Sequence, residues 1–288
     1  MASPEAEGIR VALSLAARRP DGTVAPAVVA GRLVGTDLRE VRTLLHAFPG
    51  AEEGGVHFAG RLAPDGGDGL FVALGDRGTR EWSQAPRATA GRVLHVGWDG
   101  SPRGAGVAGW DPAAWSMGHR NPQGLARDPH TGALWSTEHG PQGGDELNLI
   151  VSGANYGWPL VSRSGEYGTG RRIGVRGPLE GMTEPVFSWE EERFAPSGLA
   201  VLRGPAAGVW EGMLLAGGLA GRAVAVIAPE GRREVARLLP GWGRIRDVRT
   251  DAAGCVYLLA DAADARLLRL APRGAACALD GQGRAPGR

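Results

Sequence analysis

Short apolar runs separated by turn-forming residues dominate the chain, and sustained helical periodicity is scarce. The first two runs, residues 9–16 and 24–34, flank the turn Pro20-Asp21-Gly22-Thr23. In such a turn Pro presets φ and Gly accepts a positive φ. We therefore predict a β-hairpin over these residues and a third strand around residues 41–47.

A longer pattern recurs four times along the chain. Each copy holds a short apolar strand, a Gly-containing turn that usually carries Asp, and a second apolar strand, and another strand candidate follows it. The copies are residues 61–76, 124–140, 198–218 and 247–261, and the following strands are residues 93–96, 147–151, 223–227 and 267–270. The copies begin about 50 to 75 residues apart, which is in the range of propeller blades.

This repeat predicts an all-β protein with a β-propeller fold. In a propeller each small sheet buries both faces against its neighbours, and radial closure leaves few open edges. With residues 9–47 counted as one unit, the chain holds about five blades. We expect one propeller domain over residues 1–271 and a disordered tail over residues 272–288. A β-sandwich with chance similarities is the alternative fold.

Composition agrees with a β-fold and excludes some partners. The chain has 288 residues, including 48 Gly and 20 Pro, and 43% of the residues are hydrophobic. The net charge of +1 gives no indication of a nucleic-acid partner. No apolar run reaches the roughly 18 residues of a membrane span, and the first 20 residues do not form a secretory signal. Every basic residue is Arg, so the number of arginines is weak support for any function.

The two cysteines, Cys255 and Cys277, do not form a metal-binding pair. Because Cys255 lies in a predicted strand, a buried thiol is the favoured interpretation. A disulfide between the two residues is the less favoured alternative.

Three polar residues, His57, Arg120 and Asn121, lie in predicted loops in the first half of the chain. His57 precedes a predicted strand, so it could take a proton from a substrate hydroxyl near neutral pH, although a lone His is more often structural. Arg120 and Asn121 precede Pro122, which favours extended backbone at Asn121. The planar guanidinium of Arg120 and the side-chain amide of Asn121 suit a planar ligand that carries carboxylates. An ion pair between Arg120 and a structural acid is an equally open interpretation.

The stretch EHGPQGGDE, residues 138–146, could bind a hard cation. Carboxylates and backbone carbonyls are calcium ligands, and Gly and Pro shape the turn. The stretch does not match an EF-hand loop, and zinc is not favoured because His139 is its only histidine. A polar turn that binds no metal is an open alternative. Further along, Arg244 and Arg246 share one face of a strand start and could clamp an anion or line a solvated edge.

Seven segments, in this order, resemble the soluble quinoprotein glucose dehydrogenases and aldose sugar dehydrogenases. They are VHFAGRL (56–62), LGDRG (74–78), GHRNPQGLA (118–126), EHGPQGGDELNLI (138–150), NYGWP (155–159), FAPSGLAV (194–201) and RIRDV (244–248). The likeness covers most of the chain from about residue 9. It implies a six-bladed propeller that binds pyrroloquinoline quinone (PQQ) and calcium and oxidises the anomeric hydroxyl of aldose sugars to lactones.

The resemblance also implies a role for each matching residue. His57 corresponds to the catalytic base, which takes the anomeric hydroxyl proton while hydride passes to the quinone. Arg120 and Asn121 correspond to PQQ contacts, and Arg120 would stabilise charge on the quinone carbonyl. The carbonyl oxygens of Gly140 and Pro141, with Glu146, correspond to calcium ligands. Arg244 and Arg246 correspond to residues that bind the PQQ carboxylates. Gln84 corresponds to a polar residue near the sugar.

The chain departs from the family at several places. The first blade of the family has no counterpart before residue 9, so we expect about five blades, in a chain truncated at its start relative to the family. The family lysine near the PQQ carboxylates falls at about Ala220, and Arg222 is the candidate substitute. The acid beside the catalytic His in some members is Val56 here. Because family members are normally exported, we expect a periplasmic or secreted protein.

From the resemblance we expect a PQQ- and calcium-dependent aldose dehydrogenase that passes electrons to a soluble acceptor. Two alternatives stay open. A propeller that lacks the first blade and the family lysine could act as a binding or scaffold protein without catalysis. A calcium-dependent lactonase would hydrolyse lactones without a quinone, but it needs several convergent carboxylates, and the sequence offers few.

Overall fold

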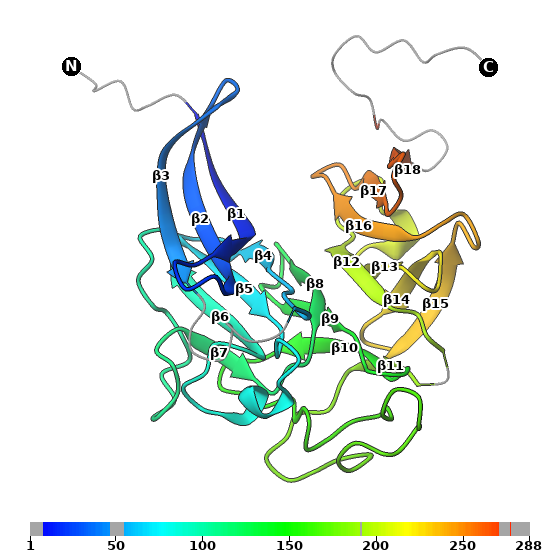
Figure 1. The fold of residues 1–288 in the computed structure, drawn as a ribbon. Helices are drawn as coiled ribbons and strands as arrows, with labels where there is room; N and C mark the ends of the chain where they lie inside the picture. The colour runs from blue at the N-terminus through cyan, green and yellow to red at the C-terminus, as the bar shows by residue number, and fades with distance from the viewer. Residues whose placement is uncertain (1–7, 47–54, 191, 271–276, 278–288) are drawn as a thin grey trace. The chain divides into compact units, whose positions relative to one another are not determined.

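A computed structural model describes residues 8–46, 55–190, 192–270 and 277. Within these residues almost all regular structure belongs to five antiparallel sheets, each a simple meander (Figure 1). The fold is therefore all-β, a β-propeller arrangement of five blades, as the repeat predicts. None of the described helices has the length and apolar character to cross a bilayer.

The elements follow one another in chain order. The first sheet holds β1 (Ile9–Arg18), β2 (Val24–Val34) and β3 (Asp37–His46), and the second holds β4 (Arg61–Pro64), β5 (Gly69–Leu74), β6 (Arg92–Gly97) and β7 (Ala114–Met117). The third holds β8 (Pro122–Arg127), β9 (Leu134–Glu138), β10 (Asp145–Ile150) and β11 (Phe187–Trp189), and the fourth holds β12 (Pro196–Val201), β13 (Leu214–Gly218), β14 (Val224–Ala228) and β15 (Arg233–Leu238). The fifth holds β16 (Ile245–Thr250), β17 (Val256–Ala260) and β18 (Leu267–Leu270), and the 3-10 helices are η1 (Arg80–Gln84) and η2 (Gly208–Trp210).

The chain divides into two compact units, residues 1–196 and 197–288. The first three sheets belong to the first unit and the last two to the second, with the boundary at the start of β12. A single domain over residues 1–271 stays a prediction. The expected disordered tail, residues 272–288, lies outside the described residues except for Cys277.

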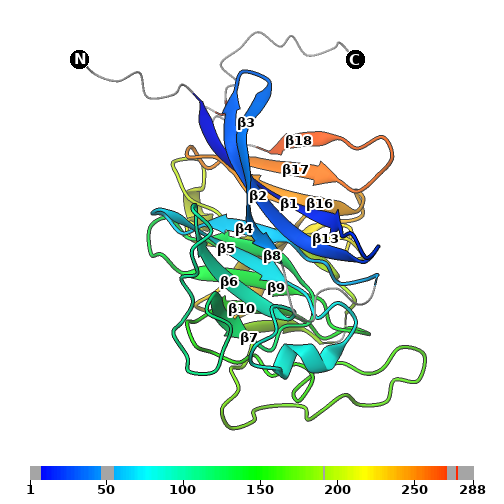
Figure 2. The same cartoon turned by 60° about the vertical axis from the view of Figure 1, so that its left-hand side comes forward.

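Neighbouring sheets within each unit pack face to face and form the cores. In the first unit Val72 of β5 joins a cluster with Val28 of β2, and the adjacent Phe71 joins another cluster with Leu125 of β8. Strand β5 is buried on both faces, which explains its unbroken apolar run. Figures 1 and 2 show the second and third sheets side by side. In the second unit Leu215 of β13 packs with Leu258 of β17.

An aspartate closes the first hairpin of three repeats. Its carboxylate accepts the backbone N–H two residues further on, at 2.7 Å for Asp65, 3.0 Å for Asp128 and 3.0 Å for Asp251. This is the local hydrogen bond by which Asp stabilises a turn. The recurring Asp of the sequence pattern is therefore a turn residue in these repeats.

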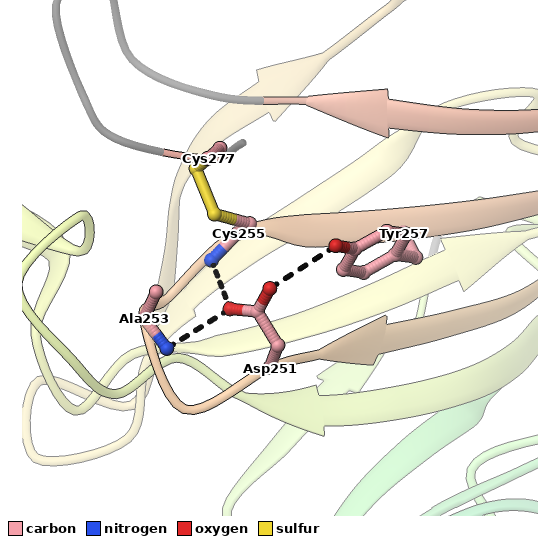
Figure 3. Close-up of a disulfide and its surroundings, with 5 residues drawn as sticks. All are labelled: Asp251, Ala253, Cys255, Tyr257 and Cys277. Atoms are coloured by element: carbon pink, nitrogen blue, oxygen red, sulfur yellow. Dashed lines mark hydrogen bonds between the residues drawn. A yellow bond between two sulfur atoms is a disulfide. The ribbon is translucent and has the colours of Figure 1, made fainter. Parts of the chain in front are cut away.

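A disulfide joins Cys255, directly before β17, to Cys277 (Figure 3). The Cα atoms of the two residues are 5.8 Å apart, and no free cysteine is left. The buried thiol expected for Cys255 is wrong, because a partner 22 residues away comes within bonding distance. Asp251 in the adjoining turn accepts hydrogen bonds from Cys255 N at 2.9 Å and Tyr257 Oη at 3.1 Å, and so braces the turn that carries the disulfide.

Candidate functional site

A buried aspartate links His57 to an indole in the first unit. Asp76 Oδ1 lies 2.6 Å from His57 Nδ1, and Asp76 Oδ2 accepts the indole N–H of Trp158 at 2.8 Å. Gly78 N donates a further hydrogen bond to Asp76 Oδ1 at 2.8 Å. The Asp76 side chain is 2% exposed and that of His57 is 18% exposed. The imidazole is thus held by a carboxylate that is itself fixed on both oxygens.

The charge of Asp76 decides which nitrogen of His57 can act as a base. Burial raises the pKa of Asp76, but hydrogen bonds from His57, Gly78 and Trp158 and the charge of His57 outweigh burial, so the pKa lies below its ordinary value. The carboxylate is therefore ionised at neutral pH and keeps a proton on Nδ1. Nε2 then carries the lone pair that can accept a proton from a hydroxyl.

Close backbone packing brings His57 to Asp76. A Cβ at Gly75 would lie 2.2 Å from the carbonyl oxygen of His57, so only Gly fits there. His57 itself has a φ of 50°, in the left-handed region. Buried Arg77 donates from Nη1 to the carbonyl oxygen of Val56 and holds this loop from behind. The carboxylate beside His57 therefore comes from Asp76 and not from position 56.

Arg120 is buried, at 5% exposure, and its guanidinium is only partly bonded. Nη1 donates to the carbonyl oxygen of His139 at 3.0 Å, and Nη2 donates to Tyr167 Oη at 3.3 Å. Its Cζ atom lies 5.5 Å from the centre of the Trp158 ring. Nε is buried and has no hydrogen-bond partner among the described residues. A buried donor without an acceptor is unfavourable, so this position suits a ligand that brings an acceptor.

Arg120 belongs to the same site as His57. Its carbonyl oxygen accepts a hydrogen bond from Asp76 N at 2.8 Å, and its guanidinium lies near Trp158, the second partner of Asp76. Asn121 follows, also buried, and its carbonyl oxygen accepts His139 N at 3.2 Å. The structure thus joins two segments that the sequence presents separately.

Gln84 has a supporting position in this site. Its Nε2 donates to the Trp158 carbonyl oxygen at 2.7 Å and to Asn155 Oδ1 at 3.0 Å. Its Oε1 accepts Asn155 Nδ2 at 2.8 Å. Both ends of the amide are therefore engaged by the segment that carries Trp158.

A pocket beside Arg120 is lined by the predicted cation-binding turn and by Trp158. A Cβ at Gly140 would lie 2.0 Å from the carbonyl oxygen of Gly143, so the turn is too tight for a side chain at Gly140. Gly140 N donates to Asp145 Oδ1 at 3.0 Å. In the part of the chain that the structure describes, the carbonyl oxygens of Gly140 and Pro141 accept no backbone hydrogen bond outside the strands. Such oxygens are ligands that calcium prefers.

Two glutamates line the same pocket and oppose each other across β9 and β10. Glu138 and Glu146 are directly paired in the strand register. Burial and the Glu138 carboxylate raise the pKa of Glu146 to about 8. His119 Nδ1 lies 3.2 Å from Glu138 Oε2. Among the described residues no three His, Cys, Asp or Glu side chains form a metal-binding group, so a cation here would depend on backbone oxygens as well.

The second unit contains the other predicted arginines. Arg244 Nε lies 2.7 Å from Asp261 Oδ2, and Arg246 Nε and Nη2 lie 3.0 Å and 2.9 Å from Asp261 Oδ1. Burial raises the pKa of Asp261, but the two guanidinium groups outweigh it, and the pKa is lowered. A pocket beside them is lined by Trp242 and Arg244. Arg222, the candidate substitute for the family lysine, is exposed in the turn between β13 and β14.

Four residues on which this geometry depends are not singled out by the sequence. They are Asp76 and Trp158, which lie inside the quoted motifs, and Tyr167 and Asp261, which do not. The motif match is the only sequence signal for Asp76 and Trp158. Their function as partners of His57 and Arg120 depends on contacts between distant segments.

The fold and this site define a β-propeller of the sugar-dehydrogenase type. The chain belongs to the Glucose / Sorbosone dehydrogenase family, whose family model matches residues 5–269. Aldose sugar dehydrogenase YliI of Escherichia coli (strain K12) is 37% identical over 279 residues, which are 93% of this chain and 74% of that protein.

Solved structures agree with this family. The apo-form of the soluble aldose sugar dehydrogenase from Escherichia coli matches with a TM-score of 0.83 and 35% identity, over 90% of this chain and 77% of that chain. The PQQ-bound form of aldose sugar dehydrogenase from Streptomyces coelicolor matches with a TM-score of 0.69 and 28% identity, over 90% of this chain and 74% of that one. The chain spans 56% and 74% of the length of two curated relatives that align with most of it.

Proposed function

We propose that this chain carries the reaction centre of an aldose dehydrogenase that uses PQQ and calcium and oxidises the anomeric hydroxyl to a lactone. The observation that carries the proposal is an oriented base linked, through Asp76 and Trp158, to a buried guanidinium that is only partly hydrogen-bonded. His57 is held by ionised Asp76, and Arg120 has a buried Nε without an acceptor among the described residues. The family and the PQQ-bound relative support the same reaction class.

The residues present fit the two groups that the proposal requires. Arg120 and Asn121 would hold PQQ, with the Arg120 Nε donating to an oxygen that the ligand supplies. The carbonyl oxygens of Gly140 and Pro141, with Glu146, would hold calcium. From the family resemblance we also expect Arg244 and Arg246 to bind carboxylates of PQQ, and Arg222 to replace the family lysine. PQQ supplies a two-electron oxidant for the hydrogen on C1 of the sugar.

The protein residues then act on the proton and on the charge. His57 Nε2 accepts the proton of the anomeric hydroxyl, and Asp76 stabilises the imidazolium that forms. Trp158 holds the second oxygen of Asp76, so the carboxylate does not rotate away from His57. The buried guanidinium of Arg120 stabilises negative charge in the site more strongly than an exposed one would, because water screens it less.

An activity measurement with a base variant tests this proposal. The full chain, mixed with PQQ and calcium chloride, is expected to reduce a dye when an aldose such as glucose is added. His57→Ala should lower the rate by about 10²- to 10⁴-fold, the usual contribution of a general base, while the variant stays folded at the assay temperature. Dye reduction at the wild-type rate in the variant would remove His57 from the mechanism.

A binding propeller without catalysis is the second candidate. The observation that favours it is the pairing of Arg244 and Arg246 with Asp261, which already neutralises part of their charge. It predicts no dye reduction with any aldose. The lactonase alternative lacks support among the described residues, where no group of three acidic or imidazole side chains gathers around a metal position.

We also propose that the protein works in the periplasm or outside the cell. The Cys255–Cys277 disulfide supports this location, because cytosolic reductants keep thiols reduced. Thiol alkylation followed by mass spectrometry of the protein taken from its own cells should find neither cysteine modified. Complete alkylation without prior reduction would contradict the proposed location.

A further inference from the structure

The connection between β10 and β11 contains a compact arm, residues 160–176, that no strand of the sheets includes (Figures 1 and 2). Isolated bridges pair Val161 with Val175 and Gly165 with Arg172, so the arm folds back on itself. At its tip Glu166 N donates to the carbonyl oxygen of Arg171 at 2.8 Å. The arm is therefore a defined structure and not an open loop.

Ion pairs anchor the arm at both ends. At its base Arg163 pairs with Glu184 and Glu190, which precede and follow β11. At its tip Arg80 of η1 forms a bidentate ion pair with Glu166, with Nη1–Oε1 at 2.7 Å and Nη2–Oε2 at 3.1 Å. Arg80 Cζ in turn lies 5.4 Å from the centre of the Trp158 ring. The tip of the arm is thus tied to η1, whose Arg80 lies near Trp158, the partner of Asp76.

Tyr167, next to the anchored Glu166, lies beside Arg120. Tyr167 Oη accepts the hydrogen bond from Arg120 Nη2 at 3.3 Å, and the ring centre is 5.9 Å from Arg120 Cζ. Even so, Tyr167 is 59% exposed. A single exposed aromatic side chain is common on protein surfaces. This one differs because a hydrogen bond and a neighbouring ion pair hold it at the edge of the candidate reaction site.

We propose that Tyr167 is a specificity-determining residue that packs against the sugar substrate, and that the Arg80–Glu166 pair positions it. This proposal rests on the proposed dehydrogenase function. One face of a pyranose consists of C–H groups, which pack against an aromatic ring, while its hydroxyls can bond a phenol. Because Tyr167 is already held, its side chain loses little conformational entropy when a sugar binds.

Steady-state kinetics of the PQQ- and calcium-loaded chain test this proposal. Tyr167→Ala should raise KM for the aldose by about three- to tenfold, the range of one aromatic contact, with a smaller change in kcat. Tyr167→Phe keeps the ring and should stay within about twofold of wild type. Glu166→Gln weakens the anchor, so its KM should lie between those of wild type and Tyr167→Ala. Calorimetric affinity for PQQ should be the same in all four proteins.

A matched control lies on the same connection. Leu179 is 37% exposed and follows the arm, so Leu179→Ala should leave KM at the wild-type value. An unchanged KM in Tyr167→Ala overturns the proposal, and so does a loss of PQQ affinity that accompanies the rise in KM, because the ring would then contact the cofactor. If the loaded wild-type chain oxidises no aldose, the dehydrogenase proposal fails and this one fails with it.

Discussion

Two arginine clusters, one in each unit, are assigned by family resemblance to the same cofactor, yet they are built differently. Arg120 is 5% exposed, and its guanidinium donates to neutral oxygens of His139 and Tyr167. Arg244 and Arg246 have side chains that are 50% and 38% exposed, and both bond Asp261. The two clusters therefore differ in two respects: Arg120 is buried and bonds neutral oxygens, whereas Arg244 and Arg246 are partly exposed and bond a carboxylate.

The difference in burial and pairing decides how much each cluster can contribute to binding an anion. Among the described residues no carboxylate is hydrogen-bonded to Arg120, although its charge favours the ionised forms of Asp145 and Glu166. Its buried guanidinium can therefore still act on a ligand in a poorly solvated place. In the other cluster one carboxylate already offsets part of two charges, and water screens the rest. We therefore expect the first unit to dominate both affinity and catalysis.

Among the residues that support these groups, the largest effect should come from Asp76, which orients His57. Asp76→Asn keeps the shape but cannot fix the proton on His57 Nδ1 by charge, so kcat should fall by about 10²- to 10³-fold. The measurement is dye reduction with saturating aldose, with Asp261→Asn as the matched change in the second unit. A fall of less than tenfold in Asp76→Asn would contradict the function assigned to this pair.

Reduction of the disulfide should have the next largest effect, on stability alone. Opening the link between Cys255 and Cys277 relaxes a loop of 22 residues, for which chain entropy predicts about 3 kcal/mol of lost unfolding free energy. Urea unfolding with and without dithiothreitol measures this loss. The Cys255→Ser/Cys277→Ser variant is the control and should not respond to the reductant. Equal stability of the wild type in both buffers would show that the link does not stabilise the fold.

A direct comparison of the two clusters should give a smaller difference. Arg120→Ala removes a buried charged donor and should lower PQQ affinity by about 10- to 100-fold. Arg246→Ala removes a half-exposed charge that Asp261 partly offsets and should lower affinity by less than about tenfold. Calorimetric titration of each apo-protein with PQQ at fixed calcium gives both values. The reverse order would contradict the comparison.

The smallest effect concerns acid stability. The folded-state pKa of Asp76 is lowered, so its ionised form stabilises the fold above its unfolded-state pKa of about 4, and this stabilisation is lost as the pH falls through the folded-state value. The pKa of Asp261 shifts in the same direction, but Asp261 is more exposed. Between pH 5 and about pH 3, the unfolding free energy of Asp76→Asn should therefore vary less with pH than that of Asp261→Asn. Identical pH profiles would contradict this ranking.

Much of the fold could be predicted from local patterns. Each predicted copy yields a hairpin and the strand after it, such as β4, β5 and β6. The central strand β5, GLFVAL, carries a continuous apolar run that makes it recognisable. The outer strands β11 and β15 have no such signal. One has three residues, and the other, REVARL, is half charged and only partly buried. A strand at the edge of a sheet needs fewer apolar residues, so its sequence lacks the apolar pattern from which a strand is predicted.

The site was less accessible to sequence reasoning. His57 and Arg120 stand out by residue type and motif, and their candidate functions stay predictions. Their partners do not stand out, because contacts such as Trp158 to Asp76 join residues that only the packing of separate segments brings together. The same holds for Cys255 and Cys277, whose spacing matches no motif. Hydrogen bonds and burial, which decide how each group acts, depend on the folded chain.

The proposed dehydrogenase function requires that this chain bind PQQ with the help of calcium. Calorimetric titration of the full apo-chain with PQQ, in calcium chloride and again with a chelator, measures this. We predict one PQQ per chain with calcium, at least tenfold weaker binding without it, and a higher thermal midpoint for the loaded protein. The absence of both heat and a thermal shift in calcium would contradict the account.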